Sequence, residues 1–238
     1  MGNDPRPAPK RGPSEAAANL GAATSVTQEL ETYWTAAATA LGLDPETVRP
    51  VFDELVELYS QAGRAYHNLT HLQAMLGFVD EHAPEVQNIP QVVMAVFFHD
   101  AIYDSKAKDN EERSAALVAD RMEALGLKRE DSEVISSLVL STKKHQPLLP
   151  GRDNELFLDA DLAILGRSSD VYFRYCDAIR EEYAWVPEVD YVAGRKAVLE
   201  SFLQREKIFF SSSVRARLEP QARENIAAEM KALEGASA

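Results

Sequence analysis

The chain has a single cysteine, Cys176, among its 238 residues. One cysteine excludes an intramolecular disulfide framework, and such scarcity is typical of proteins from a reducing compartment. We therefore expect a cytoplasmic protein that is stabilised by an apolar core. With 45% hydrophobic residues, the chain can bury such a core within one large domain.

A long apolar run is also missing. No stretch approaches the roughly 20 apolar residues that a membrane-spanning helix needs, and the N-terminus lacks the apolar segment of a secretory signal. The sequence therefore predicts no membrane partner.

Basic residues are few compared with acidic ones. There are 25 Lys and Arg against 38 Asp and Glu, which gives a formal net charge of -13. This balance argues against a nucleic-acid polymer as partner, because phosphate backbones are bound by clustered basic residues. A small phosphorylated metabolite or nucleotide remains a candidate partner, since a bound divalent cation can reverse the field inside a site.

Hairpin turns of the Asn-Gly or Asp-Gly type and alternating strand patterns are absent too. Apolar residues recur instead at helical spacing over most of the chain. Residues 1–24, rich in Pro, Gly and Ala, are expected to form a disordered tail, and residues 25–238 a single all-α domain that leaves a homo-oligomer open. Gly42 and Gly126 are expected to end helices, and Asp44 to begin one. A helix is also expected to begin near Pro220.

Polar residues interrupt the two most apolar parts of the chain. His99-Asp100 follows the run Val92–Phe98, which is apolar all round and could be a buried helix or a buried strand. A buried carboxylate needs a partner or a cation, although the pair could also face solvent at the end of the run. Asp159 and Asp161 stand within a second apolar stretch and point to different sides of a helix. Asp159 fits an N-cap, whereas Asp161 fits a cation ligand better.

Two of the five histidines, His67 and His71, lie four residues apart in the stretch RAYHNLTHL. On one helical face they could offer two ligands to one ion. Imidazole and carboxylate together suit Zn, Fe, Mn and other divalent ions. His82, at a polar helix end, is expected to be solvated.

The ordered set His71, His99-Asp100 and Asp161 resembles the metal-binding signature of the HD-domain superfamily of metal-dependent phosphohydrolases. The segment YHNLTH is also similar to the corresponding stretch of cyclic nucleotide phosphodiesterases, which belong to that superfamily. The segments FFHDAIYD, DNEERSA, STKKH and LDADLAILG look like those of the bacterial group of predicted metal-dependent HD phosphohydrolases, over roughly residues 27 to 233.

This resemblance implies a helical HD-domain bundle with one divalent metal ion, which could be Mn, Fe, Co, Ni, Zn or Mg. Its ligands would be His71, His99, Asp100 and Asp161. Such an ion lowers the pKa of bound water and polarises a phosphoryl oxygen, so the implied activity is hydrolysis of a small phosphate ester such as a nucleotide. His67 matches the phosphodiesterase histidine that protonates the leaving oxygen. An alternative has His67 as the ligand and His71 as a packed helix residue.

Glu111 and Glu112 stand where some members of the superfamily carry acidic residues near the attacking water. They also fit the first turn of a helix, where acidic residues are favoured. Asp100, Glu111 and Glu112 are therefore the acidic candidates for a catalytic role beside His67.

Four further residues are candidates for binding substrate phosphate: Lys143, Lys144, His145 and Arg205. The first three end a helix, where cations are expected in any case, and Arg205 fits an exposed helix face equally well.

Two other functions are consistent with the same residues. One is a module that senses a nucleotide without hydrolysing it. The other is a di-iron oxygenase, for which Glu111, Glu112 and His145 would have to supply the extra ligands.

Overall fold

The structure is a computed structural model that describes the backbone of residues 13–235 and the side chains of residues 25–235. Over this range the chain forms ten α-helices and three short 3-10 helices and contains no strand, which confirms the all-α prediction. In chain order these are α1 (Pro13–Ala40), α2 (Pro45–Tyr59), α3 (Leu69–Glu81), η1 (Ala83–Glu85), α4 (Ile89–Phe98), α5 (Asn110–Met122), η2 (Glu123–Leu125), α6 (Arg129–Ser141), α7 (Arg152–Leu162), η3 (Ala163–Gly166), α8 (Ser169–Glu182), α9 (Glu188–Leu203) and α10 (Ser212–Gly235).

The tail expected over residues 1–24 lies outside the described side chains, and its first twelve residues lie outside the described backbone. Helix α1 begins at Pro13. Among the described helices, none combines the length and the apolar character required to cross a bilayer.

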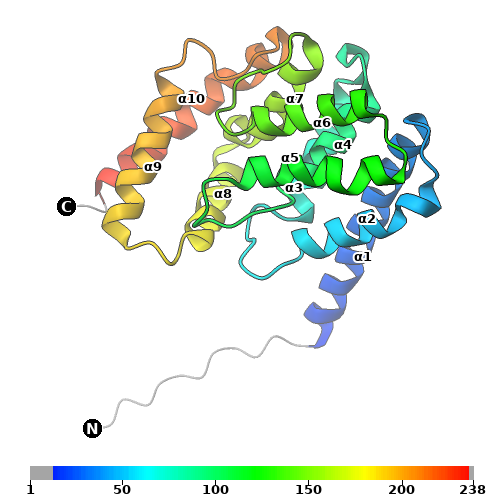
Figure 1. Ribbon diagram of the computed structural model, residues 1–238. Helices are drawn as coiled ribbons and strands as arrows, with labels where there is room; N and C mark the ends of the chain where they lie inside the picture. Colours follow the sequence, from blue (N-terminus) through cyan, green and yellow to red (C-terminus); the bar gives the residue numbers. More distant parts are fainter. Residues whose placement is uncertain (1–12, 236–238) are drawn as a thin grey trace.

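Helix α4 lies in the middle of the bundle (Figure 1), where it packs against α1, α3, α5, α6 and α7. Every side chain from Val92 to Phe98 is buried. A helix that is apolar on all sides is stable only where other elements cover all of its sides. The run that the sequence left undecided is therefore a core helix, and its C-terminal end brings His99 and Asp100 into the interior.

An aromatic cluster joins α1 and α2 to this central helix. The ring of Trp34 lies 5.3 Å from that of Phe97 in an edge-to-face arrangement and 6.0 Å from that of Phe52. Both α1 and α2 lie on the side of the bundle opposite α9 and α10 (Figure 1). Each large aromatic side chain buries much apolar area, so this cluster fixes α4 against α1 and α2. His99 and Asp100 follow the C-terminal end of the helix fixed in this way.

Helix ends follow the expected chemistry in several places. Asp44 is the N-cap of α2, and its carboxylate accepts from the backbone N–H of Glu46 at 3.2 Å. Gly42 and Gly126 have φ values of 78° and 101° and follow the ends of α1 and η2. A left-handed residue after a helix allows the last carbonyl groups to be satisfied, and glycine adopts it without a steric penalty.

Two expectations about helix ends are wrong. Helix α10 begins at Ser212 and Pro220 stands inside it. Asp159 is not an N-cap of its own helix but lies buried within α7, where its carboxylate accepts from the backbone N–H groups of Phe210 at 2.7 Å and Ser211 at 2.8 Å. Those bonds satisfy donors just before α10, which explains why that helix begins earlier.

His82 is buried rather than solvated. Its side chain follows α3, where Nδ1 donates to the carbonyl oxygen of Phe78 at 2.8 Å and the two rings stack 4.2 Å apart. His82 therefore packs on the C-terminal end of α3, and both of its ring nitrogens have partners, the carbonyl oxygen of Phe78 and the guanidinium of Arg217.

Candidate metal centre

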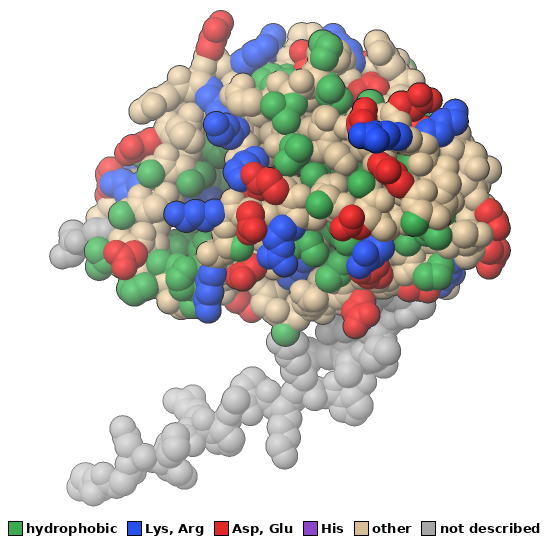
Figure 2. All heavy atoms as spheres, viewed as in Figure 1, with side chains coloured by type: hydrophobic (Ala, Val, Ile, Leu, Met, Phe, Trp, Pro, Cys, Tyr) green, Lys and Arg blue, Asp and Glu red, His purple; other side chains and the backbone are tan. Residues whose placement is uncertain are grey.

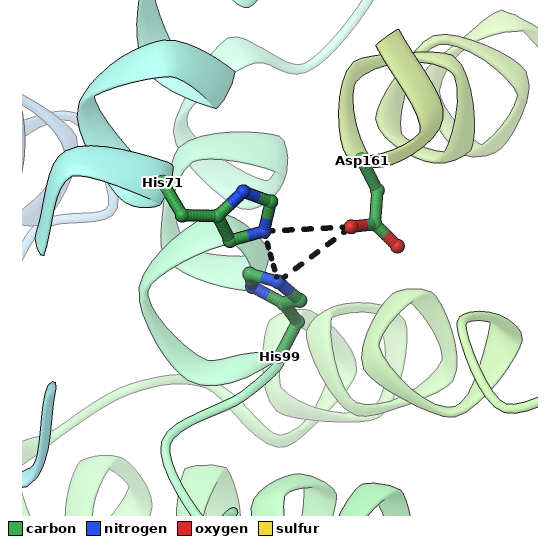
Figure 3. Close-up of side chains that lie close together, drawn as sticks. All are labelled: His71, His99 and Asp161. Carbon is green, nitrogen blue, oxygen red and sulfur yellow. Dashed lines mark hydrogen bonds and ion pairs between the residues drawn. The ribbon is translucent and has the colours of Figure 1, made fainter. Parts of the chain in front are cut away.

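Three helices bring His71, His99 and Asp161 together in the interior (Figure 3). His71 belongs to the first turn of α3, which begins after the N-cap Asn68. His99 is the C-cap of α4, and Asp161 belongs to the last turn of α7. Both histidine side chains are almost fully buried, with 3% and 1% of their surface exposed, and that of Asp161 is 13% exposed.

The donor atoms of these three residues are spaced as ligands of one ion would be. Nε2 of His71 lies 3.2 Å from Nε2 of His99 and 3.5 Å from Oδ1 of Asp161, and the third distance is 4.0 Å. Ligand atoms about 2.0 to 2.3 Å from a common ion must lie within about 4.6 Å of one another. The chemistry and spacing of this donor set therefore fit a divalent cation.

The remaining ring nitrogen of His99 has a backbone partner. Nδ1 donates to the carbonyl oxygen of Val96 at 2.8 Å, which directs Nε2 toward the other donor atoms. Metal-binding histidines in proteins commonly use their second nitrogen in this way, because the bond fixes both the tautomer and the orientation of the ring.

The electrostatics of the cluster favour positive charge at its centre. Burial alone would lower the pKa of His99, but the carboxylates of Asp100 and Asp161 outweigh it and raise this pKa to about 9. Burial opposes ionisation of Asp161, yet the adjacent imidazoles of His145 and His71 hold its pKa well below the ordinary value. Burial lowers the pKa of His71, so its imidazole remains a neutral lone-pair donor.

Asp100 lies directly beside this group. Its Oδ2 is 3.1 Å from Nε2 of His99 and 3.9 Å from Nε2 of His67. Burial would raise its pKa, but the neighbouring histidines outweigh burial and lower the pKa below the ordinary value. The carboxylate is thus ionised and available at the edge of the cluster.

His67 does not share a helical face with His71, because it precedes the N-cap of α3. Its Nδ1 lies 2.6 Å from Oε2 of Glu182, and its ring stacks on that of Tyr103 at 4.4 Å. Burial lowers the pKa of His67, but the charges of Asp100 and Glu182 outweigh it and raise the pKa overall. The two histidines of the RAYHNLTHL stretch therefore occupy different positions, His71 within the three-residue group and His67 beside it.

Glu182 was not anticipated from the sequence. Its side chain has no exposed surface, and its carboxylate accepts from the backbone N–H groups of Tyr66 and His67 and from the hydroxyl of Tyr103 as well as from His67. Burial would raise the pKa of Glu182, but the bonds from His67 and Tyr103 and the charge of His67 outweigh burial and lower the pKa to about 2. Glu182 therefore fixes the ring of His67 with Nδ1 directed to the carboxylate and Nε2 toward Asp100.

Arg64 joins the two chain segments that carry the site. Its guanidinium donates to the carbonyl oxygens of His67 at 3.1 Å, Asp100 at 2.7 Å and Ala101 at 2.8 Å. The side chain is buried over the ring of Tyr59. These bonds link the loop before α3 to the turn after α4, and they fix the position of His67 relative to Asp100.

A cavity of about 680 Å³ opens beside the cluster. His67, Asp100, His145 and Asp161 line it on one side, and residues of α8 and α9 line it on the other. Figure 2 shows the face of the molecule with a hollow left of centre, apolar side chains in its wall and basic side chains around it. A ligand in the cavity would contact the exposed edge of the donor set directly.

Some of the predicted acidic and phosphate-binding residues line this cavity, and others do not. Glu111 and Lys143 line it, whereas Glu112 does not line it and forms an ion pair with Lys143. Lys143 also donates to the carbonyl oxygen of Lys108 at 3.0 Å. Lys143 is thus held at the cavity by two partners, the carboxylate of Glu112 and the carbonyl group of Lys108.

His145 lines the cavity as well, and its Nε2 is 3.2 Å from Oδ2 of Asp161. Lys144 and Arg205 do not line it. The guanidinium of Arg205 donates instead to the carbonyl oxygens of Lys144 at 3.1 Å and His145 at 3.2 Å. Of the four residues expected to bind phosphate, the structure places Lys143 and His145 at the cavity.

No protein-family model, no curated protein and no solved structure matches the chain.

Proposed function

We propose that the chain is a metal-dependent phosphohydrolase that cleaves a small phosphate ester. The observation that carries the proposal is the convergence of His71, His99 and Asp161, with donor atoms within 4.8 Å of one another, beside a cavity that Asp161 and Asp100 also line. These four residues would hold one divalent ion. When bound, such an ion activates water for attack and polarises a phosphoryl oxygen.

His67 is the proton donor in this proposal. It lines the cavity, and Glu182 holds its Nδ1 so that Nε2 faces Asp100. Neighbouring carboxylates raise the pKa of His67, which favours its protonated form, and a protonated imidazole can give its proton to a leaving oxygen.

Basic groups at the cavity support an anionic substrate in a chain with a net charge of -13. Lys108 and Lys143 line the cavity from the segment before α5 and from the turn after α6. Lysine acts as a point charge toward phosphate, and both side chains line the cavity that Asp100 and Asp161 also line. They would attract and orient the phosphate group.

The organic part of the substrate would contact a largely aromatic wall. The aromatic residues that line the cavity are Tyr66, Tyr103, Tyr175, Tyr183, Trp185, Tyr191 and Phe202. A volume of about 680 Å³ lies within the range of small-molecule sites. Nucleotides are one class of phosphate ester that meets these conditions of size, charge and aromatic contact.

The proposal is tested by phosphate release. Purified protein is stripped with a chelator, loaded separately with Mn, Fe, Co, Ni, Zn or Mg, and incubated with a panel of phosphorylated metabolites that includes mono- and dinucleotides. We expect turnover that requires the ion and is lost in Asp100→Asn and Asp161→Asn. Absence of turnover by protein shown to hold metal would contradict the proposal, and recovery of a bound nucleotide intact would favour a sensing module.

A further inference from the structure

The turn that follows α6 has a histidine where the chain elsewhere uses glycine. Three helical segments end with the same backbone bond from an N–H to the carbonyl five residues earlier: Leu43 to Ala38, Leu127 to Met122 and Gln146 to Ser141. The left-handed residue before each donor is Gly42 in the first case and Gly126 in the second.

In the third case that residue is His145, with a φ of 45°. Among the described residues, it is the non-glycine residue with a positive φ. A side chain with a Cβ atom is disfavoured in this conformation, and residues kept there despite the strain are concentrated at functional sites.

The side chain of His145 makes a contact that glycine could not make. Its Nε2 lies 3.2 Å from Oδ2 of Asp161, whereas the other oxygen, Oδ1, is the one that faces His71 and His99. Figure 3 shows Oδ1 directed toward the two imidazoles and Oδ2 pointing away from them. His145 does not belong to the group of mutually close donor atoms. It contacts the carboxylate oxygen that is directed away from that group.

Arg205 holds the strained turn in place. Its guanidinium donates to the carbonyl oxygens of Lys144 and His145, and its Cζ lies 4.6 Å from the ring centroid of Phe202. Among the described side chains, no carboxylate forms an ion pair with it. Burial lowers its pKa, in agreement with a cation that is surrounded by backbone dipoles rather than by acids. The bonds run from Arg205 through the backbone of His145 and its imidazole to Asp161.

We infer that His145 is a positioning residue of the metal centre, which holds Oδ1 of Asp161 toward His71 and His99, and that Arg205 positions His145. This inference rests on the metal site proposed above. It assigns Arg205 to the support of the centre rather than to substrate phosphate, and it explains why a histidine occupies a position that favours glycine.

Metal affinity provides the test, and it requires no substrate. Mn²⁺ and Co²⁺ are titrated into chelator-stripped wild type, His145→Gly, Arg205→Met and Arg205→Lys, and the melting temperature of each metal-free protein is recorded. His145→Gly removes the imidazole and relieves the backbone at once. We expect it to melt at the same or a higher temperature than wild type and yet to bind metal about 10- to 100-fold more weakly, with an altered Co²⁺ absorption spectrum.

Arg205→Met is expected to weaken metal binding in the same direction, and Arg205→Lys to restore part of the affinity. Arg215→Met is the matched control, because Arg215 also donates to two consecutive carbonyl oxygens, those of Phe209 and Phe210, without contact to His145. Its effect should be confined to the melting temperature.

Wild-type affinity and an unchanged Co²⁺ spectrum in His145→Gly would overturn the inference. Loss of a second equivalent of metal in that variant would also overturn it, because the imidazole would then be a ligand. A wild type that binds no metal contradicts the proposed site together with the inference. A wild type that binds metal but hydrolyses no ester contradicts the proposed function alone.

Discussion

Nε2 of His71 lies 3.2 Å from Nε2 of His99, although the two residues are 28 positions apart in the chain. Nδ1 of His99 donates to a backbone carbonyl, so a neutral His99 presents a lone pair at Nε2. A second lone pair from His71 at this distance would be repulsive unless a proton or a cation lies between the rings. The pair is therefore arranged to receive positive charge, and Asp161 adds a third donor from α7.

The first prediction separates the two histidines of the RAYHNLTHL stretch. His71→Ala should lose the bound metal, whereas His67→Ala should retain it and lose about 10²- to 10⁴-fold in kcat, the usual contribution of a positioned proton donor. Metal per chain is measured by elemental analysis after dialysis. His82→Ala serves as the control, because His82 is also buried but packs on Phe78. If His67→Ala loses the metal as fully as His71→Ala, the two histidines do not have separate roles.

The second prediction concerns Glu182 as the partner of His67. Glu182→Gln places an N–H group among four donors, so the ring of His67 loses its fixed orientation. We expect a loss in kcat of at least about tenfold, with unchanged metal content, on an alkyl phosphate ester. With a 4-nitrophenyl ester the loss should be much smaller, since that leaving group needs no proton. Equal losses on both esters would show that Glu182 does not act through proton donation.

The third prediction is a pH dependence of stability from a buried ion pair. Arg195 donates from Nε and Nη2 to the two carboxylate oxygens of Glu229 at 2.8 and 3.0 Å, and both side chains are over 90% buried. Burial would raise the pKa of Glu229, but Arg195 and Tyr172 outweigh it and bring the pKa below the ordinary value of 4.5. The stabilisation is therefore present above pH 4.5 and is lost as the pH falls through the folded-state pKa.

Urea unfolding across pH 3 to 7 checks this pair. Glu229→Gln should lower the free energy of unfolding by roughly 3 kcal/mol at neutral pH, because Arg195 is left buried without a counter-charge. The difference from wild type should shrink as the pH falls, since protonated Glu229 resembles glutamine. Glu133→Gln is the control, because its pair with Arg129 is exposed. A difference that is constant with pH would refute the assignment.

The fourth prediction concerns two glycines whose replacement by alanine should change the stability of the fold in opposite directions. A Cβ atom on Gly166 would lie 2.6 Å from Cβ and 2.7 Å from the carbonyl oxygen of Leu218, where η3 packs on α10. Gly166→Ala should therefore destabilise the fold by about 1 to 3 kcal/mol or more. For Gly77, inside α3, no atom beyond its chain neighbours and the backbone of its own helix lies within 4 Å of such a Cβ. Gly77→Ala should stabilise the protein by about 0.5 to 1 kcal/mol, and equal effects of both changes would contradict the packing described.

Much of the helical fold follows from local signals. The N-cap Asp44 and the left-handed Gly42 and Gly126 mark helix ends in the sequence as they do in the structure. His99-Asp100 is unusual in the sequence because polar side chains directly follow an apolar run. Ionisable side chains there continue a segment that is expected to be buried, and this conflict is visible in the sequence alone.

Glu182 was missed because it stands in the charged turn Arg180-Glu181-Glu182, which is typical of an exposed helix end. Its contact with His67 joins residues 115 positions apart, and no local pattern encodes that pairing. One signal was present: Tyr172, Ile179 and Glu182 are buried on the same side of α8, at helical spacing. An acidic residue that continues a buried apolar stripe requires a partner, and here the partner is the histidine loop.

Arg64, Arg205 and the start of α10 could not be read from the sequence for a related reason. The arginines bond to backbone carbonyls of other segments, and the early start of α10 depends on Asp159 of α7. Every residue has a backbone carbonyl whatever its type, so the sequence does not show which carbonyl a side chain will bond. Such partners become visible only when the segments are packed together.

The most direct test of the proposed metal centre is a crystal structure of the protein loaded with Mn²⁺ or Zn²⁺, with the ion located by anomalous diffraction. We expect one ion within about 2.0 to 2.3 Å of Nε2 of His71, Nε2 of His99 and carboxylate oxygens of Asp100 and Asp161. His67 should lie outside the coordination sphere and remain bonded to Glu182. An ion bound elsewhere, or one coordinated by His67 in place of His71, would contradict the account.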